Sequence, residues 1–249
     1  MSAICAELVK LKRSLAWPIV VLLPIVLVLA GAATQLASGT QPDNGWDTVW
    51  LQSVGFYGLF PLGIGIAILG SLVWRVEHRG NNWNALMSSP APTLRIVVAK
   101  VVVVAGLSAL MQVVLVPAVI AVGKIVFGLP GMLPGQHLGT GLILVLATIP
   151  AAALQSALSL FLRSFAAPVA VALAASGVSI AALMVLGSVA LISPYGLVTR
   201  TALLGTGAFI DSGSVTAVDV TAIVVLSLVL SVLTVAVTTA VVNRRDTRT

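Results

Sequence analysis

The stretch WRVEHRGNNWNALMSSPAPTLRIVVAK, residues 74–100, concentrates charge in a chain that has very little of it. Only 8% of the 249 residues are charged, and long apolar runs lie on both sides of this stretch. Its titratable residues are Arg75, Glu77, His78, Arg79, Arg95 and Lys100. A polar insert between two apolar runs indicates a loop that leaves an apolar environment and returns to it.

The composition of the whole chain identifies that environment as a membrane. Hydrophobic residues make up 59% of the chain, and its mean hydropathy is +1.14. A soluble globular protein is about 45–50% apolar and about 25% charged. The apolar runs are continuous rather than alternating, which favours transmembrane helices over a β-barrel.

A spanning helix needs about 20 apolar residues, and six segments meet that requirement. We therefore predict an all-α, polytopic membrane protein that forms one domain over residues 1–249. Pro117 lies inside the third segment and predicts a kink there. The predicted spans cover residues 15–36, 54–73, 97–127, 138–162, 166–192 and 218–242.

The distribution of positive charge predicts the orientation. If the N-terminus is inside, every Lys and Arg except Lys124 and Arg200 falls on the cytoplasmic side, which satisfies the positive-inside rule. Both termini are then cytoplasmic, and the net charge of +6 reflects topology rather than nucleic-acid binding. A cleaved signal peptide over residues 1–32 is the alternative interpretation of the first span.

The spans lack the groups that ion-coupled transport or catalysis requires. Their central parts contain no Asp, Glu, Lys, Arg or His, which argues against ion-driven carriers and intramembrane enzymes. One cysteine and two distant histidines exclude a Cys-based zinc site and a His cluster. The chain also lacks a phosphate-binding loop, so any use of ATP requires a separate chain.

Milder polar side chains remain within the spans. Gln112, Gln155 and Ser156 have two open interpretations: they join helices by hydrogen bonds, or they line a substrate path. The segment 193–217 between spans five and six is semi-apolar, and we expect short helices that re-enter the outer leaflet in preference to an ordinary loop.

Two amphipathic segments lie on the predicted cytoplasmic side. Asn82 is a candidate N-cap, and Trp83, Leu86 and Met87 share one face of a short helix that Pro90 ends. Such a helix either lies on lipid or docks into a groove of a soluble partner. The N-terminal segment predicts an interfacial helix, in which the side chains three residues apart, Glu7 and Lys10, form a weak pair.

These segments resemble a known family. The sequences AELVKLKRS (residues 6–14) and EHRGNNWNALMSSPAPTLRIVVAK (residues 77–100) are similar to the corresponding parts of ABC-2-type transporter permeases. The nearest similarity is to permease subunits of lantibiotic-immunity and related antimicrobial-peptide exporters. The motif signal covers about thirty-five residues, and the layout of spans covers the whole chain.

The resemblance implies a permease in the bacterial plasma membrane that pairs with a second permease chain, identical or related. Two copies of an ABC ATPase subunit would bind the ATP and Mg, and this chain would bind no cofactor. The loop helix would be the coupling helix seated in the ATPase, with an N-terminal elbow helix carrying Glu7 and Lys10 beside it. The implied coupling interface comprises Glu77, His78, Arg79, Asn82, Trp83, Leu86 and Met87, with Arg163 as a second contact.

Two other functions stay open at this point. A stand-alone six-span carrier or receptor-like protein without an ATPase fits the hydropathy equally well. A membrane-embedded enzyme fits less well, because catalytic groups are missing. Uncharged spans suit an amphipathic or hydrophobic cargo, such as an antimicrobial peptide or a drug.

Overall fold

The computed structural model describes residues 7, 9–11, 14–78, 92–209 and 211–246, and every regular element in that part of the chain is a helix. The all-α prediction is therefore confirmed for these residues. The elements are α2 (Ala16–Ala37), α3 (Trp46–Trp50), the π-helical turn η1 (Leu51–Gly55), α4 (Phe56–Leu59), α5 (Pro61–His78), α7 (Thr93–Ile125), α8 (Gly135–Phe161), α9 (Ala166–Leu186), the 3-10 helix η2 (Gly187–Ile192), α10 (Pro194–Ala202) and α11 (Ala217–Asp246).

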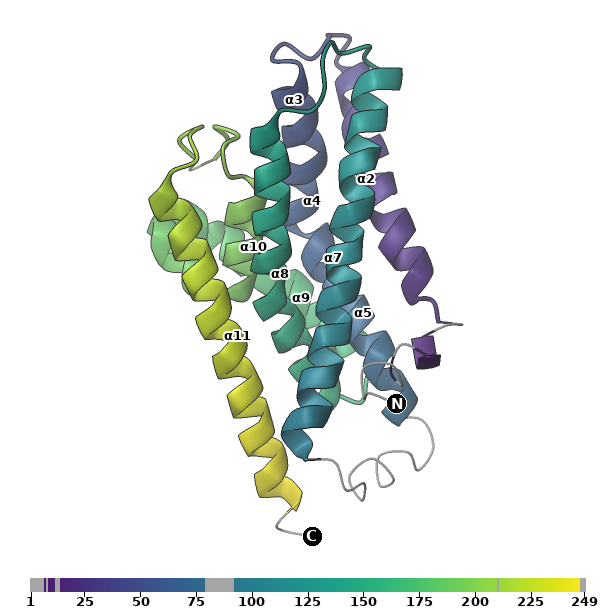
Figure 1. Cartoon of the computed structure of the whole chain (residues 1–249), viewed down its shortest axis with the longest axis vertical. Helices are drawn as coiled ribbons and strands as arrows, with labels where there is room; N and C mark the ends of the chain where they lie inside the picture. Colours follow the sequence, from purple (N-terminus) through teal and green to yellow (C-terminus); the bar gives the residue numbers. More distant parts are fainter. Residues whose placement is uncertain (1–6, 8, 12–13, 79–91, 210, 247–249) are drawn as a thin grey trace.

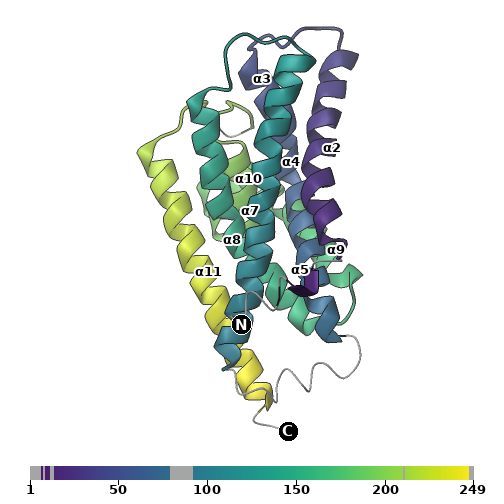
Figure 2. The ribbon, with the colours of Figure 1, turned by 45° about the vertical axis from the view of Figure 1, so that its right-hand side comes forward.

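The long helices run along one axis and form an elongated bundle (Figures 1 and 2). The ends of α5 and α11 and the start of α7 lie at one end of it, together with residues 7 and 9–11. We call this end the terminal face. The connections 38–45 and 126–134 lie at the other end, and the described parts of the connection from α10 to α11, residues 203–209 and 211–216, lie in the same half of the bundle; we call this region the opposite face.

The number of long apolar helices agrees with the prediction of several membrane spans. Five helices are long and apolar enough to cross a membrane, and the count reaches six if one bent pair forms a single span. An even number of crossings agrees with the position of residues 7 and 9–11 and the end of α11 at the same face (Figure 1). Which side of the membrane that face occupies stays a prediction based on the positive-inside rule.

The second span differs from the prediction. It begins at Trp46 rather than Val54, and it consists of two parts that meet at an angle of 47°. The break falls at Pro61, which has no backbone N–H to donate and so cannot continue a helical ladder. Asp47, Thr48 and Gln52 lower the hydropathy of the first part, which is why the sequence pattern placed the start too late.

The first part of this span lies directly against α2. A Cβ atom on Gly31 would lie 2.6 Å from the carbonyl oxygen of Gln52. Gly31 thus allows two backbones to approach closely, as small residues do between membrane helices. The side chains of Gln52 and Gln35 are hydrogen-bonded at the same contact.

The core lies between α2, α5, α7, α8 and the α3–α4 segment. Trp50, Tyr57 and Trp74 are among its largest fully buried side chains. In contrast, only 11% of the residues in the apolar stretch of α11 that could cross a membrane are buried. Val225, Leu228 and Val232 on this helix are exposed. A long apolar surface of this kind is expected where a helix faces lipid rather than water.

The expected short helix between spans five and six is present as α10. Ser193 caps its N-terminus by accepting a hydrogen bond from the backbone N–H of Gly196, and Pro194 occupies the first turn. Tyr195, Leu197 and Val198 are buried. The helix is thus part of the packed bundle, while its depth in a bilayer stays a prediction.

Candidate functional site

Four charged side chains meet at the terminal face and form what we call the charge cluster: Glu7, Lys10, Glu77 and Lys100. The Lys100 ammonium lies 2.6 Å from Glu7 Oε2 and 3.0 Å from Glu77 Oε1. The Lys10 ammonium lies 2.8 Å from Glu7 Oε1 and 2.6 Å from Glu77 Oε1. Each lysine therefore bridges both carboxylates, and the formal charge of the cluster is zero.

The cluster is largely removed from water. The side chains of Lys100 and Glu77 are 1% and 4% exposed, whereas that of Lys10 is 35% exposed. A buried charge is tolerated when it is paired and its remaining hydrogen-bonding groups are satisfied. Lys100 meets this condition, because it also donates to the carbonyl of Val73 at 3.1 Å and lies 4.9 Å from the ring centroid of Trp74.

Lys10 closes the cluster at its exposed edge. Burial disfavours its charge, but the hydrogen bonds and negative charges of Glu7 and Glu77 outweigh that effect and raise the pKa of its ammonium above the usual value. Lys10 therefore keeps its positive charge at neutral pH.

The cluster joins three parts of the chain that are separate in sequence. Glu77 lies at the end of α5, Lys100 lies near the start of α7, and Glu7 and Lys10 lie before α2. Ion pairs thus join the two helices that flank the connection between α5 and α7, and they join both helices to the N-terminal segment.

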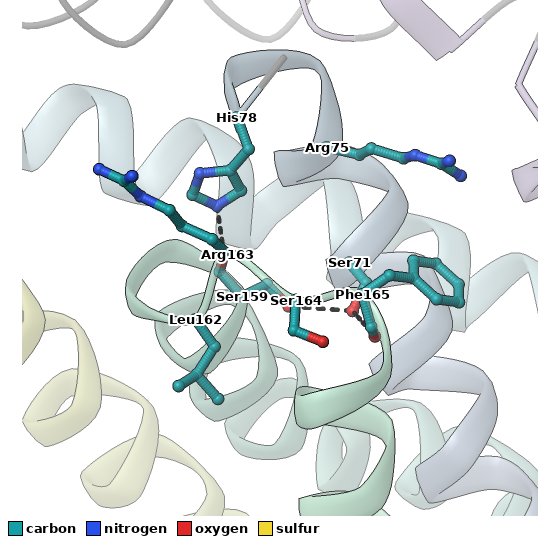
Figure 3. Close-up of a pocket in the computed structure, with 8 residues that line it drawn as sticks. All are labelled: Ser71, Arg75, His78, Ser159, Leu162, Arg163, Ser164 and Phe165. Carbon is teal, nitrogen blue, oxygen red and sulfur yellow. Dashed lines mark hydrogen bonds between the residues drawn. The ribbon is translucent and has the colours of Figure 1, made fainter.

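A cavity of about 250 Å³ opens beside the cluster, between the end of α5 and the connection from α8 to α9 (Figure 3). His78 Nε2 donates a hydrogen bond to the Ser159 carbonyl at 2.7 Å, which fixes the imidazole as one wall. Arg163 contributes to the same cavity from the connection. The structure therefore brings together two predicted interface residues, His78 and Arg163, that are distant in sequence.

The predicted polar residues of the spans lie inside the bundle. Ser156 accepts a hydrogen bond from the Trp74 indole at 2.9 Å, and Gln155 donates to the Tyr195 hydroxyl. Gln112 lies 3.5 Å from the Tyr57 hydroxyl. These contacts join helices; a role on a substrate path stays a prediction for all three.

A second ionic group lies at the opposite face. Arg200 pairs with Asp211, and its guanidinium also reaches Asp219 at 3.5 Å. Burial opposes the ionisation of Asp211, but hydrogen bonds from the Gly207 N–H, the Arg200 guanidinium and the Gly213 N–H outweigh it and lower the pKa of this carboxyl. This group holds the connection between α10 and α11 against the bundle.

Some of the predicted interface residues lie outside the described part of the chain: Arg79, Asn82, Trp83, Leu86 and Met87. The same applies to the short coupling helix that they would form. Residues 7 and 9–11 are helical, but a complete elbow helix likewise stays a prediction.

Sequence reasoning did not include Lys100 or Trp74 in the site. A signal for Lys100 was present, because a single ammonium just inside a long apolar helix requires a partner or access to water. The partner could not be identified, since Glu7 and Glu77 are 93 and 23 positions away. The contact depends on how α2, α5 and α7 pack.

The described residues thus define a class, namely polytopic helical membrane proteins whose ionisable groups gather at the ends of the bundle. Among these residues, no group of three His, Cys, Asp or Glu side chains could hold a metal ion. The model of the ABC-2 family transporter proteins matches residues 3–179, so the chain belongs to that family. No curated protein and no solved structure matches the chain.

Membership of this family makes the chain a membrane permease component of an ABC transporter. The family partners an ABC ATPase in the membrane, and its permease component is typically not catalytic. The similarity to lantibiotic-immunity permeases is a finer assignment that the family match does not address.

Proposed function

We propose that this chain is the permease subunit of an ATP-driven exporter in a bacterial plasma membrane. Its termini and terminal face would lie in the cytoplasm, where two copies of a separate ATPase subunit hydrolyse ATP. A second permease chain, identical or related, would complete the translocation path. This chain would bind neither ATP nor Mg, which belong to the ATPase.

The observation that carries the proposal is the charge cluster. An ATPase can drive a permease only through an element that transmits its movement to several spans. The connection between α5 and α7 has this property, because Glu77 and Lys100 tie its ends together and Glu7 and Lys10 add the segment that enters α2. An ATPase bound to this connection would therefore act on three spans together.

The distribution of ionisable groups supports an external energy source. In α7 and α8 the ionisable side chains are Arg95, Lys100, Lys124 and His137, all within eight residues of a helix end. Ion-coupled carriers usually place such groups within the membrane. ATP hydrolysis on another chain removes that requirement.

The proposed cargo is amphipathic or hydrophobic, with an antimicrobial peptide as the first candidate and a drug-like molecule as the second. Uncharged, Gly- and Ala-containing spans favour such a cargo over an ion or a sugar. Gln112, Gln155 and Ser156 are the polar groups that it would meet if the helices separate during transport. Export is inferred from the resemblance to peptide exporters.

The test is co-purification of the tagged chain with the ABC ATPase encoded beside its gene. We expect Trp83→Ala to weaken the complex by about 2 kcal/mol, roughly thirtyfold in Kd, as for the loss of an aromatic anchor at an interface. Trp17→Ala is the matched control, because Trp17 lies on α2 and is 42% exposed outside the proposed interface. An unchanged complex in Trp83→Ala would argue against the proposal.

A further inference from the structure

The cavity at the terminal face has an entirely basic set of charged lining residues. Arg75 comes from α5, Arg163 comes from the connection between α8 and α9, and His78 stands between them (Figure 3). Ser71, Ser159 and Ser164 add hydroxyl groups, and none of the lining residues is acidic. Such a lining favours an anion with several acceptor oxygens.

The helix that starts at this cavity strengthens the preference. α9 begins at Ala166, next to the lining residues Ser164 and Phe165, without a side-chain cap or an acidic residue in its first turn. The free N–H groups and the dipole at a helix N-terminus attract anions. The α9 N-terminus and the two arginines thus act in the same direction.

The acidic residue closest in sequence does not cancel this positive charge. Glu77 lies one position before His78, but its carboxylate is 4% exposed and bound to Lys10 and Lys100. The charge cluster is neutral as a unit. Among the described residues that line the cavity, therefore, no acidic side chain compensates Arg75 and Arg163.

The cavity also has an apolar side, which makes a lipid the fitting ligand. Leu162 and Phe165 line it together with the arginines. From the rim of the cavity, α9 continues as an apolar helix. Only 22% of the residues in its membrane-spanning apolar stretch are buried, and Val171 and Leu173 are exposed. A headgroup at the basic end and an acyl chain along α9 would each find a matching surface.

We propose that this cavity binds the phosphodiester headgroup of an anionic phospholipid. Arg75 and Arg163 would close over the phosphate from its two sides, with Ser164 and the N-terminus of α9 beneath it. In the structure, both guanidinium groups extend away from the centre of the cavity, on opposite sides of His78 (Figure 3). Both side chains are exposed, so they can turn toward a ligand without leaving a packed core.

Native mass spectrometry of the full chain in detergent, titrated with phosphatidylglycerol, tests the proposal. The wild-type chain should bind phosphatidylglycerol more tightly than phosphatidylcholine. The double variant Arg75→Gln/Arg163→Gln should bind it about 25-fold more weakly, since each basic residue near an anionic headgroup contributes about fivefold. Ser164→Asp, which adds a negative charge to the cavity, should weaken binding in the same direction.

Arg95→Gln is the matched control, because Arg95 is exposed at the same face in the first turn of α7 but does not line the cavity. Its affinity should change less than about twofold. An equal loss in this control, equal binding of phosphatidylcholine, or full competition by inorganic phosphate would each overturn the proposal. The assay contains no ATPase, so its result is independent of the proposed coupling role of His78 and Arg163.

Discussion

Lys100 makes the contacts that stabilise the charge cluster at the terminal face. Its ammonium is almost fully buried and contacts two carboxylates, a backbone carbonyl and the Trp74 ring. A buried pair adds little net free energy while intact, but removal of one partner leaves an uncompensated buried charge. The structure therefore tolerates this lysine only with both glutamates in place.

We expect Lys100→Met to lower the free energy of unfolding by about 3–5 kcal/mol, because Glu77 then keeps Lys10 alone as a partner. The thermal midpoint of the purified chain in detergent measures this change. Arg95→Gln on the same helix is exposed and should shift the midpoint little. A Lys100→Met chain as stable as wild type would contradict the role assigned to the cluster.

The contribution of Asp211 to the stability of the chain depends on pH. Its pKa is lowered in the folded chain, so its contribution to stability is present above the usual Asp pKa of about 3.9 and is lost as the pH falls through the lower folded value. Asp211→Asn should therefore cost about 1.5–3 kcal/mol at pH 7, and the difference from wild type should shrink below about pH 3.9.

Thermal midpoints of Asp211→Asn and wild type across this pH range provide the measurement. Asp43→Asn, an exposed acid of the same face, is the control and should differ little from wild type at any pH. A pH-independent difference for Asp211→Asn would mean that geometry rather than charge holds this connection.

At the scale of elements, close backbone contact sets the position of the second span. Gly31 of α2 has a backbone carbonyl at 2.6 Å from the place of a Cβ atom, whereas Gly106 of α7 has nothing within 4 Å. Gly31→Ala should destabilise the chain by about 1–3 kcal/mol through overpacking. Gly106→Ala should stabilise it by about 0.5–1 kcal/mol, because an unfolded chain with alanine has fewer conformations than one with glycine and so loses less entropy on folding.

The same thermal assay compares the two variants, which both place a methyl group in a long apolar helix. We expect Gly31→Ala to lower the thermal midpoint and Gly106→Ala to raise it. If both variants gain stability, α2 does not approach the second span as closely as the structure shows.

Several elements could be predicted from the sequence, because long apolar runs have no alternative to a spanning helix. α2 and α9 each begin within one residue of the predicted start. The start of the second span could not be predicted, since Asp47 and Gln52 reduce its hydropathy and its packing against α2, α7 and α10 is a tertiary property. The cluster partners of Lys100 were hidden for the same reason: they depend on tertiary packing, which periodicity does not report.

At the scale of the whole molecule, ionisable groups gather at the two ends of an apolar bundle. The terminal face carries the charge cluster and the basic cavity, and the opposite face carries Arg200 with its two aspartates. This arrangement suits a permease that is driven from one end. The family match to residues 3–179 supports the same interpretation.

The proposed function requires that the ATPase acts on the connection between α5 and α7. Crosslinking from a photo-reactive amino acid at position 83, in cells that also produce the ABC ATPase encoded beside this chain, measures that contact. We expect an abundant crosslink from position 83 to the ATPase and none from position 17, which is exposed on α2. Crosslinks from position 83 to lipid alone would contradict the proposed function.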